Sequence, residues 1–344
     1  MFFSKFQKNR EKCTYSHLFL LLLRLHSTGN RYVRNMINRE LIRLKVLQLV
    51  YAYYQNESKA LDVAEKELDF SLNKAYELYQ YLLNLLVELR RYGERKLEAA
   101  QSRAQRFGRE MEGVSADRQM ARNKLLLAME ENKTLAEYRE KKAAWEEEPQ
   151  YIRSLYTAFT EDEAFRLYLE VGDFSFEADR EVIRRLYKTI LVDNEELDGI
   201  LESHSLYWND DRPVVDTFVM KSIKRFTEDS KPEDPLLPLY DSENDRIFAK
   251  TLFRETLLRK EQTQALIAQN CKGWEYNRLA LMDVVVMQIA LTEMLVFAEI
   301  PLSVTFSEYL DLARVYSTPR SPGYINGLLD HIAKKLQEQK VLLK

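Results

Sequence analysis

Glycine is scarce in this sequence: nine of the 344 residues are glycine and eight are proline. Folds with many tight turns, and glycine-rich loops that bind phosphate, need more glycine than this. The two cysteines, Cys13 and Cys271, lie far apart and form no Cys-x-x-Cys motif. A disulfide framework and a cysteine-based zinc site are therefore excluded, and we expect Cys271 to be an ordinary packing residue.

Patterns that carry catalysis are also missing. The four histidines, His17, His26, His204 and His331, are scattered and form no His-x-x-x-His pair, the spacing that a helical metal site would use. Neither a Gly-x-Ser-x-Gly motif nor a Walker sequence occurs. We therefore expect a protein that is not an enzyme, with no catalytic residue, no metal and no cofactor.

Neither sign of charge is in large excess, because the net charge is −3. Residues 1–35 contain seven Lys or Arg and one acid, a charge of +6, so the rest of the chain carries −9. Such a chain does not bind nucleic acid through bulk charge. Any RNA binding must therefore depend on a local basic patch.

The first 35 residues imitate a signal peptide, with a basic start and a short apolar run from Leu18 to Leu23. The run is too short to span a bilayer, Arg24 interrupts it, and no small-residue cleavage site follows. A helix opens cleanly after Met36, with Asn38 as its N-cap. We interpret residues 1–35 as a disordered extension or an upstream start, and we expect a cytoplasmic protein without membrane spans.

The sequence is rich in helix-forming residues, which predicts an all-α fold. Hydrophobic residues make up 46% of the chain, which is enough for a large core. Residues 39–55 are apolar at nearly every angle around a helix, which indicates burial on most sides. Further helices are expected over about 59–106, 117–143, 150–170, 176–203 and 213–227, and through the last hundred residues. Three prolines in residues 229–241 indicate a linker or irregular loop.

The end of the long second helix is rich in charge, with the sequence RRYGERKLEAAQSRAQRFGRE over residues 90–110. This stretch is similar to a basic RNA-binding segment, but acids are interleaved with its bases. A solvated helix face that ends near Gly108 and Gly113 is the interpretation that we adopt. RNA binding is the alternative.

Two segments of the chain are similar to each other, residues 179–220 and 245–287. Each contains a helix pattern, a short loop with a tryptophan (Trp208 or Trp274) and a second helix pattern. Duplication and chance similarity between helices both account for this. In either case we expect the tryptophan to fix a corner between two helices.

The most specific pattern lies at residues 274–336 and ends in an aromatic–aliphatic–Asn–Gly–aliphatic–Leu–Asp motif. It resembles the C-terminal half of the NusB family of bacterial transcription antitermination factors. The matching positions are Trp274, Arg278, Leu279, Asp283, Ala290, Glu293, Ile300, Pro301, Val304, Glu308, Leu312, Ala313, Arg314 and the closing GYINGLLD. Residues 245–257 and the stretch RLKVLQLVYAYYQ from Arg43 also resemble family helices.

The resemblance implies an all-α, NusB-like helical bundle with an expanded helical region inserted in its N-terminal half. Three parts are expected: the extension 1–35, the first family helix with the expanded region over 36–240, and the C-terminal half over 241–344. The implied function is to pair with the ribosomal protein NusE, bind boxA RNA in rRNA transcripts, and join the antitermination complex on RNA polymerase.

The resemblance also implies site residues. Arg39, Arg43, Arg320 and Tyr324 match the RNA-binding region, although salt bridges are the alternative for both helix arginines and core packing for Tyr324. Tyr51 and Asp283 match positions that contact NusE, with core packing as the alternative for Tyr51. We interpret Asn326 as structural, capping the helix that it begins, with Gly327 allowing a close approach.

Some positions depart from the family pattern. The basic run before the first helix is thin, Gln288 replaces a usual Arg, and Ser307 replaces a usual Asn. These departures leave open an alternative function. The chain would then be a NusB-like helical scaffold, or an RNA-binding module associated with rRNA modification, without boxA specificity.

Overall fold

The computed structural model describes residues 39–56, 60–107, 115–142, 145–240, 242–271, 276–342 and 344. These residues are predominantly helical and include no β-strand, which confirms the all-α prediction. The predictions for residues 1–35, Met36, Asn38 and Trp274 lie outside the described residues. In the part of the chain that is described, no helix is both long and apolar enough to span a membrane.

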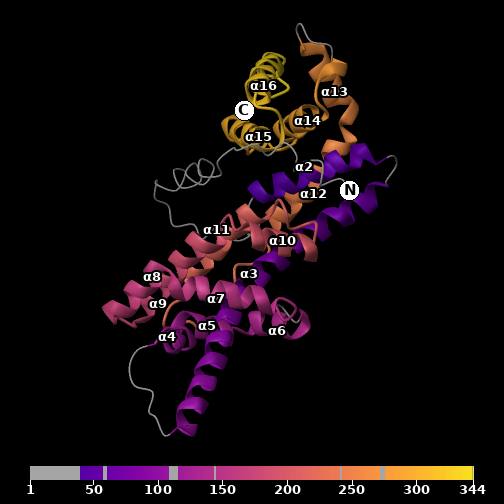
Figure 1. Ribbon diagram of the computed structural model, residues 1–344. Helices are drawn as coiled ribbons and strands as arrows, with labels where there is room; N and C mark the ends of the chain where they lie inside the picture. Colours follow the sequence, from indigo (N-terminus) through magenta and orange to yellow (C-terminus); the bar gives the residue numbers. More distant parts are fainter. Residues whose placement is uncertain are drawn as a thin grey trace.

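Helix α2 (Arg39–Gln55) lies in the middle of the molecule (Figure 1). Leu41, Ile42, Val46, Leu47 and Val50 are fully buried, which confirms the prediction of a helix enclosed on most sides. It packs against α3 (Leu61–Arg106), α12 (Glu243–Leu258) and α14 (Leu281–Val296). Segments that are far apart in the sequence therefore meet on α2.

Helix α3 contains 46 residues and is about 69 Å long at 1.5 Å per residue. Its first turns lie beside α2 and α12, and the helix then runs to the opposite end of the molecule (Figure 1). Near that end Gly93 permits close packing. A Cβ atom there would lie 3.1 Å from the ring of Tyr156 and 3.3 Å from the Cβ of Met120. The expanded region is therefore assembled along α3.

The helix predicted over 117–143 is instead three helices: α4 (Ala116–Arg122), α5 (Lys124–Glu131) and α6 (Lys133–Lys142). Asn123 and Asn132 separate them with non-helical backbone angles, and their side chains accept hydrogen bonds from the amides of Leu126 and Leu135. An asparagine that caps the next helix ends the previous one without any glycine or proline.

A capping side chain, aspartate in one case and asparagine in the other, also divides each of the next two predicted helices. The 150–170 pattern forms α7 (Pro149–Glu161) and α8 (Glu163–Val171), with Asp162 as the N-cap of α8. The 176–203 pattern forms α9 (Phe176–Leu186), the π-helical turn η3 (Tyr187–Leu191) and α10 (Glu195–His204), with Asn194 as the N-cap of α10. The 213–227 prediction corresponds to α11 (Arg212–Arg225).

Trp208 fixes a helix corner, as the internal similarity predicts. It lies in the turn between α10 and α11, its side chain is buried, and its indole Nε1 donates a hydrogen bond to the carbonyl oxygen of Lys74 at 2.8 Å. The corner is thereby attached to the side of α3.

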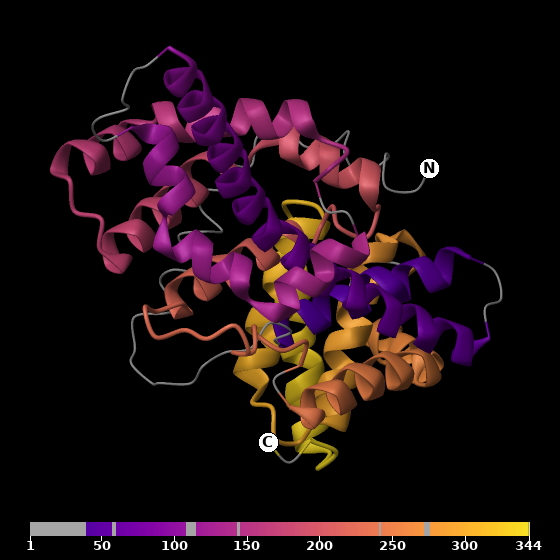
Figure 2. The same cartoon turned by 90° about the horizontal axis from the view of Figure 1, so that it is seen from below.

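In the 229–241 segment, the described residues 229–240 contain no helix, as predicted, and Leu236 and Leu237 are buried. After it come α12, α13 (Lys260–Asn270), the short 3-10 turn η4 (Tyr276–Arg278) and α14 to α16. Helices α15 (Leu302–Tyr316) and α16 (Ser321–Glu338) pack against α14. Figure 2 shows this C-terminal group and the α4–α9 group at different ends of the molecule.

Candidate nucleic-acid interface

Arg43 is enclosed in the bundle, with 3% of its side chain exposed. Its Nε and Nη2 donate hydrogen bonds to the two carboxylate oxygens of Glu293 on α14, at 2.8 and 3.0 Å. Its Nη1 lies 3.3 Å from Glu308 on α15. The structure therefore does not support the prediction that Arg43 contacts RNA. Its guanidinium is occupied by the chain's own acids, the alternative that the sequence left open.

Glu293 is the centre of this cluster and is fully buried. Besides Arg43, it accepts hydrogen bonds from Thr305 and from Tyr309 on α15, each at 2.9 Å. Burial alone would lower the pKa of Arg43, but the hydrogen bonds and charges of its partners outweigh it and hold that pKa above the ordinary value. The cluster therefore joins α2, α14 and α15 through charge-assisted hydrogen bonds.

Arg39 lies one turn earlier on α2 and is more accessible, with 35% of its side chain exposed. Its Nε is 3.1 Å from Asp245 on α12, and its guanidinium lies 4.7 Å from the centre of the Phe248 ring. A partly exposed pair of this kind contributes little to stability. Arg39 therefore keeps an open side that faces solvent.

The loop between α15 and α16 is held by Asp283, in the first turn of α14. Its carboxylate accepts hydrogen bonds from the hydroxyls of Ser317 and of Ser321, the latter at 2.9 Å. Only 7% of Asp283 is exposed. The prediction that it contacts NusE directly is not supported, because its oxygens are already used within the chain.

Arg320 and Tyr324 lie together at the start of α16. Arg320 is the exposed N-cap residue, and Tyr324 lies one turn further on. Tyr324 is half-buried against the core, and its hydroxyl is 3.3 Å from the Cys271 sulfur. Burial and the contact with Cys271 raise the pKa of Tyr324, so its hydroxyl stays protonated. Cys271 is half-buried, in line with a packing role.

The interpretation of Asn326 and Gly327 was wrong. Helix α16 begins at Ser321, so Asn326 lies inside the helix, where it is exposed and caps nothing. A Cβ atom added to Gly327 would meet nothing within 4 Å. This face of α16 is therefore open.

The predicted RNA-binding residues form two groups, one at each end of α14. Arg39 and Arg43 lie near Glu293, whereas Arg320 and Tyr324 lie near Asp283. Ten residues of helix separate Glu293 from Asp283, which corresponds to about 15 Å. Tyr51 is half-buried on α2 and packs against the core. Gln288, between the two groups on α14, is fully buried and donates a hydrogen bond to Thr263 at 3.2 Å.

Sequence reasoning missed the residues that hold the two groups in place. Ser317, Ser321, Thr305 and Tyr309 are ordinary helix and loop residues in the sequence, and only their contacts reveal them. Among the described residues no cluster of His, Cys, Asp or Glu is arranged to hold a metal ion.

Comparison with known proteins identifies the C-terminal region. Residues 215–334 match the NusB family model, so the match starts inside α11, before residue 245, where the C-terminal part of the resemblance begins, and it does not include the stretch from Arg43. The transcription antitermination protein NusB of Salinibacter ruber is 39% identical over 108 residues, which cover 31% of this chain and 68% of that protein.

The NusB protein of Geobacter sulfurreducens is 33% identical over 111 residues, 30% of this chain and 80% of its own length. A solved structure of T. maritima NusB is 27% identical, covers 34% of this chain and 73% of its own, and superposes with a TM-score of 0.26. The expanded region before residue 215 lies outside the family match. The two relatives from Salinibacter ruber and Geobacter sulfurreducens show that the chain belongs to the NusB family.

Proposed function

We propose that this chain is a transcription antitermination factor that binds boxA RNA of rRNA transcripts together with the ribosomal protein NusE. The observation that carries the proposal is the family match over residues 215–334, with relatives that are named transcription antitermination proteins. The antitermination complex on RNA polymerase is the corresponding larger partner. The proposal includes no catalytic role.

The start of α16 is the RNA contact in this proposal. Arg320 places a guanidinium in solvent beside a helix N-terminus, where the helix dipole also favours phosphate. Tyr324 presents the exposed part of its ring one turn away, at a distance that suits a base attached to that phosphate. The Asp283 hydrogen bonds fix the loop, so both side chains are positioned before RNA arrives.

The α2 group contributes differently. Arg39, with its exposed side, is a second phosphate contact, in the group at the other end of α14 from Arg320. Arg43 is a positioning residue because it ties α2 to α14. Tyr51 is the proposed contact to NusE, and Asp283 supports the interface only through the loop that it holds.

The proposal is tested by fluorescence anisotropy of labelled boxA RNA and of a scrambled RNA, with the full chain, with and without NusE, at two salt concentrations. We expect tighter binding to boxA and a further gain with NusE. Tyr324→Ala should weaken binding by about 1–3 kcal/mol, the contribution of one stacked base, whereas Tyr324→Phe retains it.

Arg320→Ala should weaken binding and reduce its salt dependence, because one phosphate contact is removed. The matched control is Arg153→Ala on α7, an exposed arginine far from α16, which should bind as the original chain does. Equal binding of boxA and scrambled RNA, whether or not NusE is present, would contradict the proposal. It would favour a helical scaffold without boxA specificity.

A further inference from the structure

The last turns of α3 present a basic stripe that the NusB-like region does not include. At 100° per residue, the residues of this stripe point within about 60° of the direction of Tyr92 around the helix axis. Glu94 and Glu98 point about 120° or more away from that direction. The acids that interrupt the sequence therefore face elsewhere. The α3 stripe consists of Tyr92, Arg95, Lys96, Ala99, Arg103 and Arg106.

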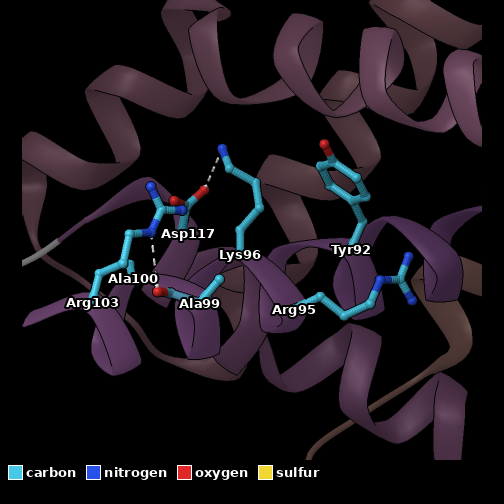
Figure 3. A pocket seen from close by; sticks show the side chains of 7 residues that line it. All are labelled: Tyr92, Arg95, Lys96, Ala99, Ala100, Arg103 and Asp117. Carbon is cyan, nitrogen blue, oxygen red and sulfur yellow. Dashed lines mark hydrogen bonds and ion pairs between the residues drawn. The ribbon is translucent and has the colours of Figure 1, made fainter. Parts of the chain in front are cut away.

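The first half of the stripe is partly neutralised. Lys96 is 3.0 Å from Asp117 on α4, and Arg95 is 2.7 Å from Glu88 one turn before the stripe. Both cations remain about half exposed, at 46% and 58% of their side chains. Lys96 and Asp117 line an open depression of about 440 Å³. Figure 3 shows the Lys96 ammonium directed toward the Asp117 carboxylate.

The second half of the stripe is not neutralised. Among the described residues Arg103 donates only to the backbone oxygen of Ala99, at 3.3 Å (Figure 3), and its side chain is exposed. Arg106 is also exposed, and neither arginine pairs with an acid among the residues that the structure describes. Phe107, the next residue, has 77% of its surface exposed, so an aromatic ring stands beside the two arginines.

We infer that the α3 stripe binds the phosphate backbone of single-stranded RNA, as a second contact for RNA held at α16. The inference deepens the proposed function, on which it rests for the source of the RNA. Arginines one turn apart suit successive phosphates, and the exposed ring of Phe107 and the accessible part of Tyr92 suit bases. An acidic protein would find few apolar anchors here, because this surface offers only alanine, part of Tyr92 and the single ring of Phe107.

The position of the stripe sets the length of RNA that uses it. Ion pairs of Asp69 with Lys250 and of Glu65 with Arg254 attach the start of α3 to α12. From Asp69 to Ala99 the helix rises about 45 Å, which is about 13 nucleotides of a stacked strand at 3.4 Å each. An RNA of fewer than about 13 nucleotides therefore ends before the stripe, and a longer transcript reaches it.

The test compares the double variant Arg103→Ala/Arg106→Ala with the matched control Arg153→Ala/Arg185→Ala in the full chain. Both remove two exposed arginines from helices and introduce the best helix former. Anisotropy is measured against salt for three RNAs: boxA alone, boxA with a 20-nucleotide single-stranded extension, and a uridine 30-mer.

We expect the stripe variant to reduce the salt slope for the extended RNA and the uridine 30-mer by about 1.4, or 0.7 per phosphate contact. The control variant, and boxA alone with either variant, should show no change. Equal slopes for the stripe and control variants on the two long RNAs would overturn the inference. So would stripe-dependent binding of a polyglutamate probe without any effect on RNA, which would indicate an acidic protein partner.

Failure of the proposed function has a different signature. Without boxA recognition, boxA and scrambled RNA bind equally and Tyr324→Ala has no effect. The uridine 30-mer still reports on the stripe, because that comparison does not depend on the boxA sequence.

Discussion

Two helices of this protein, α2 and α3, carry arginines in positions that suggest RNA binding. In the structure one arginine of α2 is buried and paired with acids, whereas those at the end of α3 are exposed. On α2, Arg43 is surrounded by Glu293 and Glu308 and is removed from solvent. On α3, Arg103 and Arg106 have no acid partner in the described part of the chain and face solvent. The acids that the fold places beside an arginine decide whether that arginine is available to a ligand.

The surroundings of the two helices explain the difference. Helix α2 lies between α3, α12 and α14, so every cation on it must be paired to be buried at low cost. Lys45, also on α2, lies 2.6 Å from the buried Asp211 for the same reason. The end of α3 packs against α4, and among the described residues its last two arginines, Arg103 and Arg106, remain exposed to water.

The largest effect is expected on the buried side of the comparison. Glu293→Ala leaves the Arg43 guanidinium buried and partly unpaired, and also removes the acceptor for Thr305 and Tyr309. We expect a loss of about 3–5 kcal/mol in the free energy of unfolding, measured by urea denaturation. The control Glu98→Ala on the exposed face of α3 should change stability by less than about 0.5 kcal/mol. A similarly small effect of Glu293→Ala would show that the cluster is dispensable.

A smaller effect concerns the second buried pair of α2. Burial raises the pKa of Asp211 from 3.8 to about 6, although the charge of Lys45 acts in the opposite direction. In the folded chain Asp211 stays protonated up to about pH 6, whereas in the unfolded chain it releases its proton near pH 4. Between pH 4 and 6 the folded state therefore binds more protons than the unfolded state. Asp211 thus lowers the free energy of unfolding as the pH rises through this window.

The variant Asp211→Asn lacks this titration. Its stability relative to the original chain should rise across pH 4 to 6, by on the order of 1–3 kcal/mol at 1.4 kcal/mol per pKa unit. Urea denaturation at several pH values measures the difference. Asp216, whose pKa burial also raises to about 6, is present in both chains and cancels. A constant gap between the two chains would mean that Asp211 is ionised throughout.

The smallest effect on stability is expected from the stripe. Arg103→Ala/Arg106→Ala removes side chains without acid partners in the described structure and should change the free energy of unfolding by less than about 0.5 kcal/mol. Thermal unfolding followed by circular dichroism measures this. A loss of more than 1 kcal/mol would show that the two arginines support the fold and are not reserved for a ligand.

The sequence revealed the elements better than it revealed their contacts. Apolar periodicity identified α2 and α3, and the C-terminal motif identified the family, because both signals are local. Arg43 and Glu293 are 250 residues apart, so their pairing could not be read from either segment. The breaks at Asn123 and Asn132 were missed because capping depends on a single side chain within an otherwise helical pattern.

The α3 stripe is an intermediate case. Its angular separation from Glu94 and Glu98 could have been computed from the sequence, since it needs only the helical repeat. The helical repeat cannot show which cations form ion pairs with acids, or that α4 packs against α3. The structure supplies both.

The most direct measurement labels the arginines of the full chain with an arginine-selective dicarbonyl reagent, with and without a long boxA-containing RNA, and locates the adducts by mass spectrometry. Arg43 should stay unlabelled in the folded protein under both conditions. Arg103, Arg106 and Arg320 should react freely and be protected by RNA. Labelling of Arg43 as fast as Arg103, or no protection of Arg103 and Arg106 by RNA, would contradict the division of roles between α2 and α3.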